Sequence, residues 1–395
     1  MKSAYLVILA LLGGSSIASA SAVLHGQREV FFVGFSITGQ QSGDAAAAPT
    51  LSESVVSRPG AINDTVVARN KLLRAEIEAR SPREFKLAPI EKQPMLDGTT
   101  SSIIVTAAID RETVVTEVID GKYKITVEIA AQALFFDGES KQVLGSVPVT
   151  VQYIDLLSTP PDEATKRRAL LALLDKSGEY GLIAGMASAI ASARIPKDAR
   201  RFMQLIDASY AEGALDEYPT LKQKFRSGIV GLEFSKYFAS RTGLALLPYR
   251  GETSQAIANA LLVVFADGSQ QALQVPAADY VIRINLDRLI KRTASQDSVA
   301  EQRLYGVFLT ISVAQPLART PYFNQQIRQG AYKTIPVAQV VVDDAQALYD
   351  TLLESFVAIG DASQGRATDW LAQQPGGRAA RTEWNEFRKK IEECR

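Results

Sequence analysis

The sequence predicts an α+β fold in which two related small open-sheet α/β domains are joined by a helical segment. Alternation of apolar and polar residues, which is typical of half-buried strands, occurs in two separate blocks, at 102–154 and 278–342. Between these blocks, residues 159–240 place apolar side chains at helical spacing. The chain has 395 residues and is 47% hydrophobic, so it is long and apolar enough to bury sizeable cores.

Residues 1–22 are a predicted signal peptide. Lys2 supplies the positive charge, residues 4–12 are apolar, and Ala-Ser-Ala sequences end at Ala20 and Ala22. An uncleaved anchor is the alternative, although the apolar run is shorter than the roughly 20 residues that span a bilayer. No cysteine stands near the cleavage site to carry a lipid anchor. We therefore expect a periplasmic or secreted protein with no integral membrane span.

Residues 23–158 are the first predicted α/β domain. The apolar run 30–36 predicts a buried strand, and 66–80 predicts an amphipathic helix that Pro82 ends. Three longer strands are expected at 102–111, 122–134 and 143–154. Asp137-Gly138 is a typical hairpin turn, so the last two strands should pair.

Residues 159–242 are a predicted helical connector. Its helices are expected at about 162–175, 179–194, 197–211 and 219–240, with prolines at 196 and 219 between them. Gly181 and Gly185 have the small-residue spacing that lets helices approach each other closely.

Residues 243–360 are the second predicted α/β domain, and 361–395 are a polar C-terminal tail that is partly helical. The expected order in the domain is a strand at 243–249, a helix at 254–265, strands at 273–275, 278–288, 304–313 and about 334–342, and a helix at 344–359. In the tail, Glu386 with Lys390 and Lys389 with Glu393 could support a helix through i,i+4 pairs.

The second domain reads as a divergent repeat of the first. Residues 101–106 correspond to 278–283, and Ile109-Asp110-Arg111 corresponds to Leu286-Asp287-Arg288. The alternative is that two unrelated segments share a common order of elements.

The segments 245–249 and 278–282, with a helix between them, resemble the anticodon-binding-domain-like fold of periplasmic proteins. That group includes the N-terminal domain of TolB and the proteins CsgG, PelC and LpoB. The flagellar protein FlgT is similarly built of small periplasmic domains. The resemblance covers about 243–345 and extends weakly to 29–155, and it implies tandem TolB N-terminal-like domains. It implies a non-catalytic role in assembly or regulation at the cell envelope. Departures from the group are the missing lipidation cysteine and the helical middle.

Few residues are available for catalysis. The chain has one histidine, His25, and one cysteine, Cys394, which disfavours a Ser-His-Asp triad or a zinc site. The carboxylate pairs that remain are Asp110 with Glu112, Asp343-Asp344 and Glu392-Glu393. Neighbouring residues in a strand point to opposite faces, and Asp344 suits a helix N-cap. We therefore assign no catalytic, cofactor or metal residue.

Charge, the single cysteine and the sheet edges bear on which partners the chain could have. The 43 basic and 43 acidic residues balance, which disfavours a nucleic-acid partner. Cys394 is interpreted either as an inert thiol on a frayed tail or as the site of an intermolecular disulfide. Open sheet edges could pair with envelope proteins or with a second copy of the chain.

We predict a non-catalytic binding or assembly protein of the bacterial cell envelope, supporting an appendage, a secretion channel or a cell-wall machine. Two alternatives stay open at this point: a carboxylate-dependent polysaccharide hydrolase, and a periplasmic protein that binds a ligand between its domains.

Overall fold

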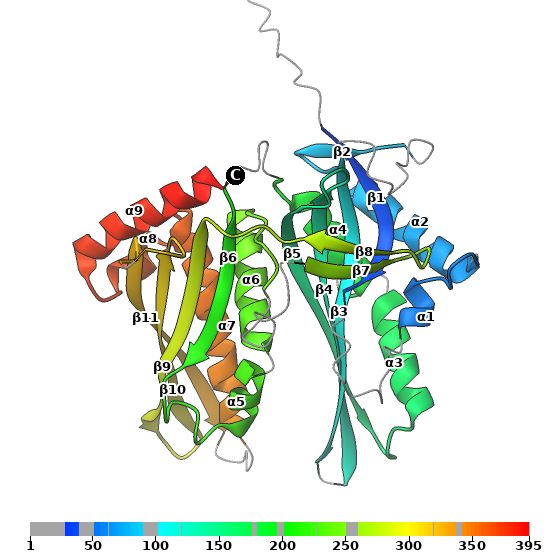
Figure 1. Ribbon diagram of the computed structural model, residues 1–395. Helices are drawn as coiled ribbons and strands as arrows, with labels where there is room; N and C mark the ends of the chain where they lie inside the picture. Colours follow the sequence, from blue (N-terminus) through cyan, green and yellow to red (C-terminus); the bar gives the residue numbers. More distant parts are fainter. Residues whose placement is uncertain are drawn as a thin grey trace, which may run out of the picture.

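Two open β-sheets, with helices packed against them, form the part of the chain that the computed structural model describes (Figure 1). The structure describes residues 28–38, 51–61, 63–89, 102–119, 121–175, 180–195, 201–226, 228–249, 260–318, 320–336 and 342–394. Helices and strands mix along the chain, so the predicted α+β class is confirmed. The predicted signal peptide at 1–22 lies outside the described residues.

The first sheet has the strand order β5-β4-β3-β1-β7-β8, with β2 alongside β1. Its strands are β1 (Arg28–Ile37), β2 (Phe85–Leu87), β3 (Ile103–Ile119), β4 (Lys122–Asp137), β5 (Val143–Leu157), β7 (Ala260–Phe265) and β8 (Gln270–Gln274). Strands β3, β4 and β5 form an antiparallel meander, and β1 runs parallel to β3. The expected pairing of β4 with β5 is thus confirmed.

Helices α1 (Ser52–Val55), α2 (Asp64–Ala79), α3 (Glu163–Asp175) and α4 (Leu182–Ser192) belong to the first sheet. Asn63 begins α2, because its side chain accepts hydrogen bonds from the backbone N–H groups of Thr65 and Val66. Leu73 and Ile77 lie one turn apart on the buried side of α2 and are fully buried in the core.

The close approach at Gly185 is to a strand, and not to another helix as its spacing had predicted. A Cβ at this position would lie 3.0 Å from Cγ1 of Val149, so only glycine lets α4 lie this close to β5.

The second sheet has the order β11-β10-β9-β6. Its strands are β6 (Met203–Tyr210), β9 (Tyr280–Gln296), β10 (Ala300–Ala314) and β11 (Phe323–Pro336). The helices α5 (Pro219–Arg226), α6 (Ile229–Thr242), α7 (Asp344–Ser363), α8 (Thr368–Ala372) and α9 (Gly377–Glu393) contribute to its core. Both α6 and α7 pack on one face of this sheet (Figure 1). Among the described residues no helix is long and apolar enough to cross a membrane.

The two sheets share topology and register. In each, the first strand runs parallel to the first strand of an antiparallel meander. Three pairs of the first sheet have a counterpart in the second. Phe32–Val105 corresponds to Leu205–Ile282. Ile104–Phe136 corresponds to Val281–Ala314, and Phe135–Gly145 corresponds to Val313–Phe323. This shared register supports the predicted duplication, which stays a prediction as a statement about descent.

A short segment connects the two sheets. Leu246 exchanges backbone hydrogen bonds with Ser146 of β5, and the N–H of Leu247 donates to the carbonyl of Met203 in β6 at 2.9 Å. Helix α6 also belongs to both halves, because Phe234 lies in the core of the second sheet and Ala239 in that of the first. The expected strand at 243–249 is therefore a set of isolated bridges rather than a regular strand.

Two predicted helices are wrong in the part that the structure describes. The expected helix at 197–211 is strand β6 where it is described; a bulge between Leu205 and Asp207 inserts one residue and gives its apolar positions a helix-like spacing. Residues 260–265 of the expected helix at 254–265 form strand β7, and the remainder lies outside the described residues. The helix expected in the polar tail at 361–395 is confirmed as α9, and both α8 and α9 pack on the core rather than standing in solvent.

The predicted domain boundaries do not separate the sheets. Strand β6, placed in the connector at 159–242, belongs to the second sheet. The hairpin β7–β8, placed in the second domain at 243–360, joins the first sheet, where Ser36 pairs with Phe265. Each sheet therefore takes a strand from beyond its expected boundary.

Candidate functional site

Asp110 and Glu112 hold the backbone in place rather than facing each other across a site. Asp110 is the unpaired residue of a bulge in β3 and accepts hydrogen bonds from Thr38 and, at 2.7 Å, from Nε2 of Gln132. Burial raises the pKa of Asp110 to about 6, although both hydrogen bonds oppose the shift. Glu112 accepts from the backbone N–H of Leu51 at 3.0 Å.

The equivalent bulge in the second sheet also carries an aspartate. Asp287 lies unpaired between Leu286 and Arg288 of β9. It accepts hydrogen bonds of 2.8 Å from Asn285 and from Thr310 of β10, the strand that corresponds to β4. A carboxylate tied to the next strand therefore occurs at the same place in both sheets, which indicates a structural role in holding the bulge.

Asp343 and Asp344 have separate structural roles. Asp343, and not Asp344 as predicted, is the N-cap of α7, because its side chain accepts from the N–H of Gln346 at 2.9 Å. Asp344 accepts from Nζ of Lys291 at 2.8 Å and from the hydroxyl of Tyr305 at 2.6 Å. Burial raises the pKa of Asp344, but these hydrogen bonds outweigh it and the pKa lies below its ordinary value.

Glu393 ties the end of α9 to β9. Its carboxylate accepts from the hydroxyl of Tyr280, from Arg201 and, at 2.7 Å, from Nζ of Lys390. Its neighbour Glu392 is exposed. In this adjacent pair, the Glu393 carboxylate is therefore already held by structural hydrogen bonds.

Cys394 lies in the core and not on a frayed tail. The side chain is 3% exposed and belongs to the same cluster as Phe387 and Ile391 of α9. Burial raises the pKa of its thiol to about 12, so the reactive thiolate is disfavoured. An intermolecular disulfide stays a prediction, and it would require the end of α9 to leave the core. His25 lies outside the described residues.

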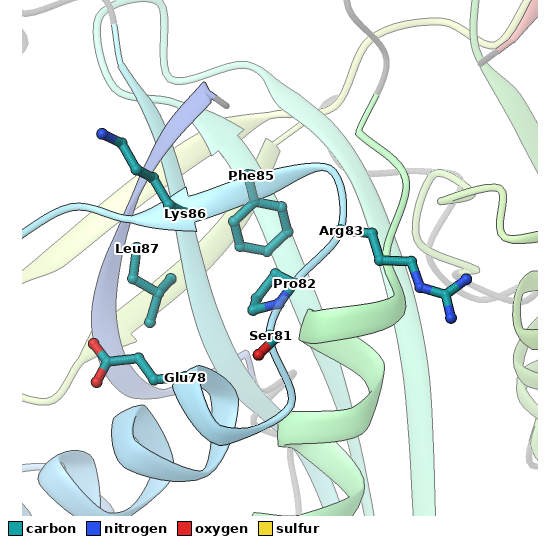
Figure 2. Close-up of a pocket in the computed structure, with 7 residues that line it drawn as sticks. All are labelled: Glu78, Ser81, Pro82, Arg83, Phe85, Lys86 and Leu87. Carbon is teal, nitrogen blue, oxygen red and sulfur yellow. The ribbon is translucent and has the colours of Figure 1, made fainter. Parts of the chain in front are cut away.

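A shallow pocket of about 620 Å³ lies beside the turn between α2 and β2 (Figure 2). Its seven lining residues are Glu78, Ser81, Pro82, Arg83, Phe85, Lys86 and Leu87. Figure 2 shows Arg83 directed away from the other side chains, and Glu78 is paired with Arg74 at 2.9 Å. The one carboxylate that lines this pocket is thus engaged, and two convergent acids are not available there. Within the described ranges no group of three or more potential metal-binding side chains occurs.

The clearest surface feature is the far half of the meander β3-β4-β5, which extends beyond α4 at the bottom of Figure 1. Val115, Ile154 and Leu156 are 45%, 54% and 51% exposed and share one face, because Val115 and Ile154 both pair with Thr126. On the opposite face Ile125 and Val127 are in the core, whereas Val118 and Tyr153 are 66% and 37% exposed. We call this exposed set of Val115, Ile154 and Leu156 the ribbon patch.

Sequence reasoning placed these strands but did not find the ribbon patch. The signal was that alternation in 143–157 gives way to the mixed run Tyr153-Ile154-Asp155-Leu156-Leu157, in which both faces carry apolar residues. Such a run indicates a strand that has an apolar residue on its solvent face.

Comparison with known proteins identifies no family. No protein-family model matches the chain, and no curated protein matches it. Among solved structures, a putative neuraminyllactose-binding hemagglutinin homolog from Helicobacter pylori matches with a TM-score of 0.28 and 12% identity. The match covers 50% of this chain and 95% of that chain. Similarity at this level assigns neither a fold nor a function.

Proposed function

We propose that this chain is an exported, non-catalytic binding or assembly protein of the bacterial cell envelope, with other envelope proteins as partners. The observation that carries the proposal is the ribbon patch. Export rests on the signal-peptide pattern of residues 1–22. The resemblance to TolB N-terminal-like domains points in the same direction and stays a prediction.

The ribbon patch has the properties of a protein-binding surface. Its three apolar side chains come from the strands on either side of β4, with Thr126 and Lys124 of β4 between them. Exposed apolar side chains gathered on one face and rimmed by polar residues often mark an interaction site, because burying apolar surface is worth about 25 cal/mol per Å². The patch lies on a rigid sheet, so little ordering is needed when a partner binds.

An open edge lies beside the patch. Strand β5 ends the first sheet and packs against α6, but among the described residues the one backbone bridge on its outer edge is at Ser146, far from Ile154. A partner strand could pair with the backbone near Ile154 and cover the patch with its own side chains. This arrangement suits an assembly factor that receives an extended segment of another envelope protein.

The non-catalytic part of the proposal is supported by how the candidate carboxylates are used. Asp110, Glu112, Asp343, Asp344 and Glu393 each accept hydrogen bonds that hold a bulge, a loop or a helix end. A glycoside hydrolase needs two carboxyl groups facing one substrate bond.

The test is affinity capture from the periplasm of the source bacterium, with the mature chain as bait. We expect envelope proteins to be recovered by the natural chain and lost with the triple variant V115S/I154S/L156S. Leu72 is 49% exposed on α2, so L72S is the matched control and should retain the partner. Equal recovery by the triple variant and the natural chain would remove the ribbon patch from the proposal, and recovery of bait alone after crosslinking would contradict the proposal itself.

A further inference from the structure

The outer face of the second sheet, opposite α6 and α7, carries a row of arginines around an aromatic ring. Arg288 of β9 pairs with Phe308 of β10, which pairs with Arg328 of β11. The guanidinium of Arg288 lies 4.1 Å from the centroid of the Phe308 ring, and that of Arg328 lies 5.7 Å from it. Both arginines are exposed. The neighbours of Phe308 in β10, Val307 and Leu309, point inward and are buried.

Two further arginines lie on the same face. Arg283 pairs with Ser312, which pairs with Asn324 of β11. At the other end of the sheet, Arg292 is in register with Leu304 and Tyr332, and Tyr332 is 63% exposed. The four exposed arginines at 283, 288, 292 and 328, with Phe308 and Tyr332, are called the arginine face below.

The four positive charges of the arginine face exceed those of the two described carboxylates beside them, Asp207 and Asp287. Elsewhere in the chain, Arg69, Arg80 and Arg303 are each in an ion pair with a carboxylate, whereas no ion pair is formed by the four arginines of this face with any described residue.

The carboxylates nearest in register are engaged by neutral groups. Asp287 accepts from Asn285 and Thr310, and Asp207 accepts from Ser209 at 3.0 Å. In a chain with 43 basic and 43 acidic residues, this local excess of cations is a specific feature of one surface.

We propose that the arginine face binds a linear polysaccharide that bears carboxylate groups. A guanidinium presents a planar fork of donors that matches a carboxylate, and Arg288 is held in place by the ring beneath it. Successive side chains on one face of a strand lie about 7 Å apart and neighbouring strands about 4.8 Å apart, so the four cations are spread over an extended platform. Hydroxyl and amide groups between them, at Ser312, Asn324 and Gln326, can bond sugar hydroxyls.

Two other polyanions fit the face less well. A membrane surface is usually held by apolar side chains that project into the lipid, whereas Phe308 is half-buried beneath Arg288. Single-stranded nucleic acid stacks successive bases on open aromatic faces, and only one ring of this face, Tyr332, is open, because the Phe308 ring is already in contact with guanidinium groups. The proposal rests on this face alone and does not depend on export or on the ribbon patch.

The experiment measures binding of the mature chain to polygalacturonate oligomers, with neutral dextran oligomers as the matched uncharged probe, at 20 mM and 150 mM salt. We expect binding to polygalacturonate that weakens with salt, and no binding to dextran. The variant R288Q/R328Q should bind at least tenfold more weakly. The control R167Q/K389Q removes the same charge from exposed helix positions and should bind within twofold of the natural chain. Circular dichroism establishes that both variants fold.

Three results would overturn the proposal. One is the absence of polygalacturonate binding at 20 mM salt by a folded natural chain. The second is equal weakening in R288Q/R328Q and in R167Q/K389Q, which would indicate net charge alone. The third is tighter binding to phosphatidylglycerol vesicles or to an oligodeoxynucleotide than to polygalacturonate, lost in R288Q/R328Q, which would reassign the face to that partner.

Discussion

At the scale of single residues, this protein uses its carboxylates and its special glycines to hold irregular backbone. The two bulge aspartates, Asp110 and Asp287, are tied to Gln132 and Thr310 on the next strand. A bulge leaves one residue without ladder partners, and a short acidic side chain can fix its position through neighbouring polar groups. The two aspartates therefore have a structural explanation that needs no ligand.

Asp110 should make stability depend on pH. Its pKa is about 6 in the folded protein, above the ordinary value of 3.8. The folded state therefore favours the protonated side chain, and this contribution to stability is fully present below about pH 4 and is lost as the pH rises through 6. We expect the free energy of unfolding of D110N, measured relative to the natural chain, to be about 1–3 kcal/mol more favourable at pH 7 than at pH 4, because each pKa unit corresponds to about 1.4 kcal/mol. Urea unfolding of both proteins at the two pH values measures this. A difference between them that does not change with pH would contradict it.

Gly185 should tolerate no side chain. In G185V the added atoms would meet Val149, where a Cβ already lies 3.0 Å from Cγ1. Such overpacking typically costs about 1–3 kcal/mol. The control A191V changes a half-buried position on the same helix and should cost less. The measurement is the midpoint of urea unfolding, and equal midpoints for the two variants would show that α4 can move away from β5.

At the scale of elements, the sequence predicted regular strands well and irregular ones poorly. The meander β3-β4-β5 was predictable because its alternation is long and is interrupted by a typical turn. Strand β6 was missed because its bulge disrupts the period of two. The packing of helix α9 on the core was missed because charged residues surround Trp384, Phe387 and Ile391, although their spacing of three and four residues places them on one face. The arginine face could not be predicted, because its members lie on three strands and meet only once the register is known.

The packed position of α9 predicts that it contributes to stability. Phe387 is fully buried and stacks on Phe323 of β11 with ring centroids 4.9 Å apart. We expect F387A to lower the free energy of unfolding by about 3–5 kcal/mol. The variant K389A alters an exposed residue of the same helix and should be nearly neutral. Denaturant unfolding distinguishes this from a solvated tail, for which F387A would also be neutral.

The edge of β11 is closed by a side chain. The amide of Gln374, which is 6% exposed, accepts from the N–H of Arg328 at 2.8 Å and donates to its carbonyl at 3.2 Å, as a neighbouring strand would. We expect Q374A to cost about 1–3 kcal/mol, because both backbone groups lose their partner. Q374E keeps the acceptor but turns a carboxylate oxygen toward the carbonyls of Arg328 and Trp370, so it should cost at least as much. Hydrogen exchange at the Arg328 amide should accelerate in Q374A, and unchanged exchange would argue against this contact.

At the scale of the whole molecule, the two sheets behave as one unit because chain segments cross between them. Residues 244–247 bond to β5 and β6, α6 packs in both cores, and the β7–β8 hairpin extends the first sheet. The repeat seen in the register is therefore not a pair of separable modules. Cutting the chain near the middle of its sequence would therefore separate segments that belong to the same sheet.

Calorimetry should show a single unfolding transition for the natural chain. Gly145 lies against residue 245, where a Cβ would come within 2.7 Å of the Ala245 Cβ, so G145V should force the connecting segment away from β5. We expect this variant to lose about 1–3 kcal/mol and to show two transitions. Two transitions already in the natural chain would mean that the sheets unfold independently.

The hairpin from beyond residue 259 also constrains the order in which the protein can mature. During synthesis, or on threading through a translocation channel, β1 and β3 emerge long before the strand that completes the edge beside β1. Until β7 arrives, that edge is open to wrong partners, and the wait is set by the length of chain in between. A holding chaperone that shields nascent β1 would be most useful in this interval. The completed protein, with that stretch of β1 paired, would no longer need it.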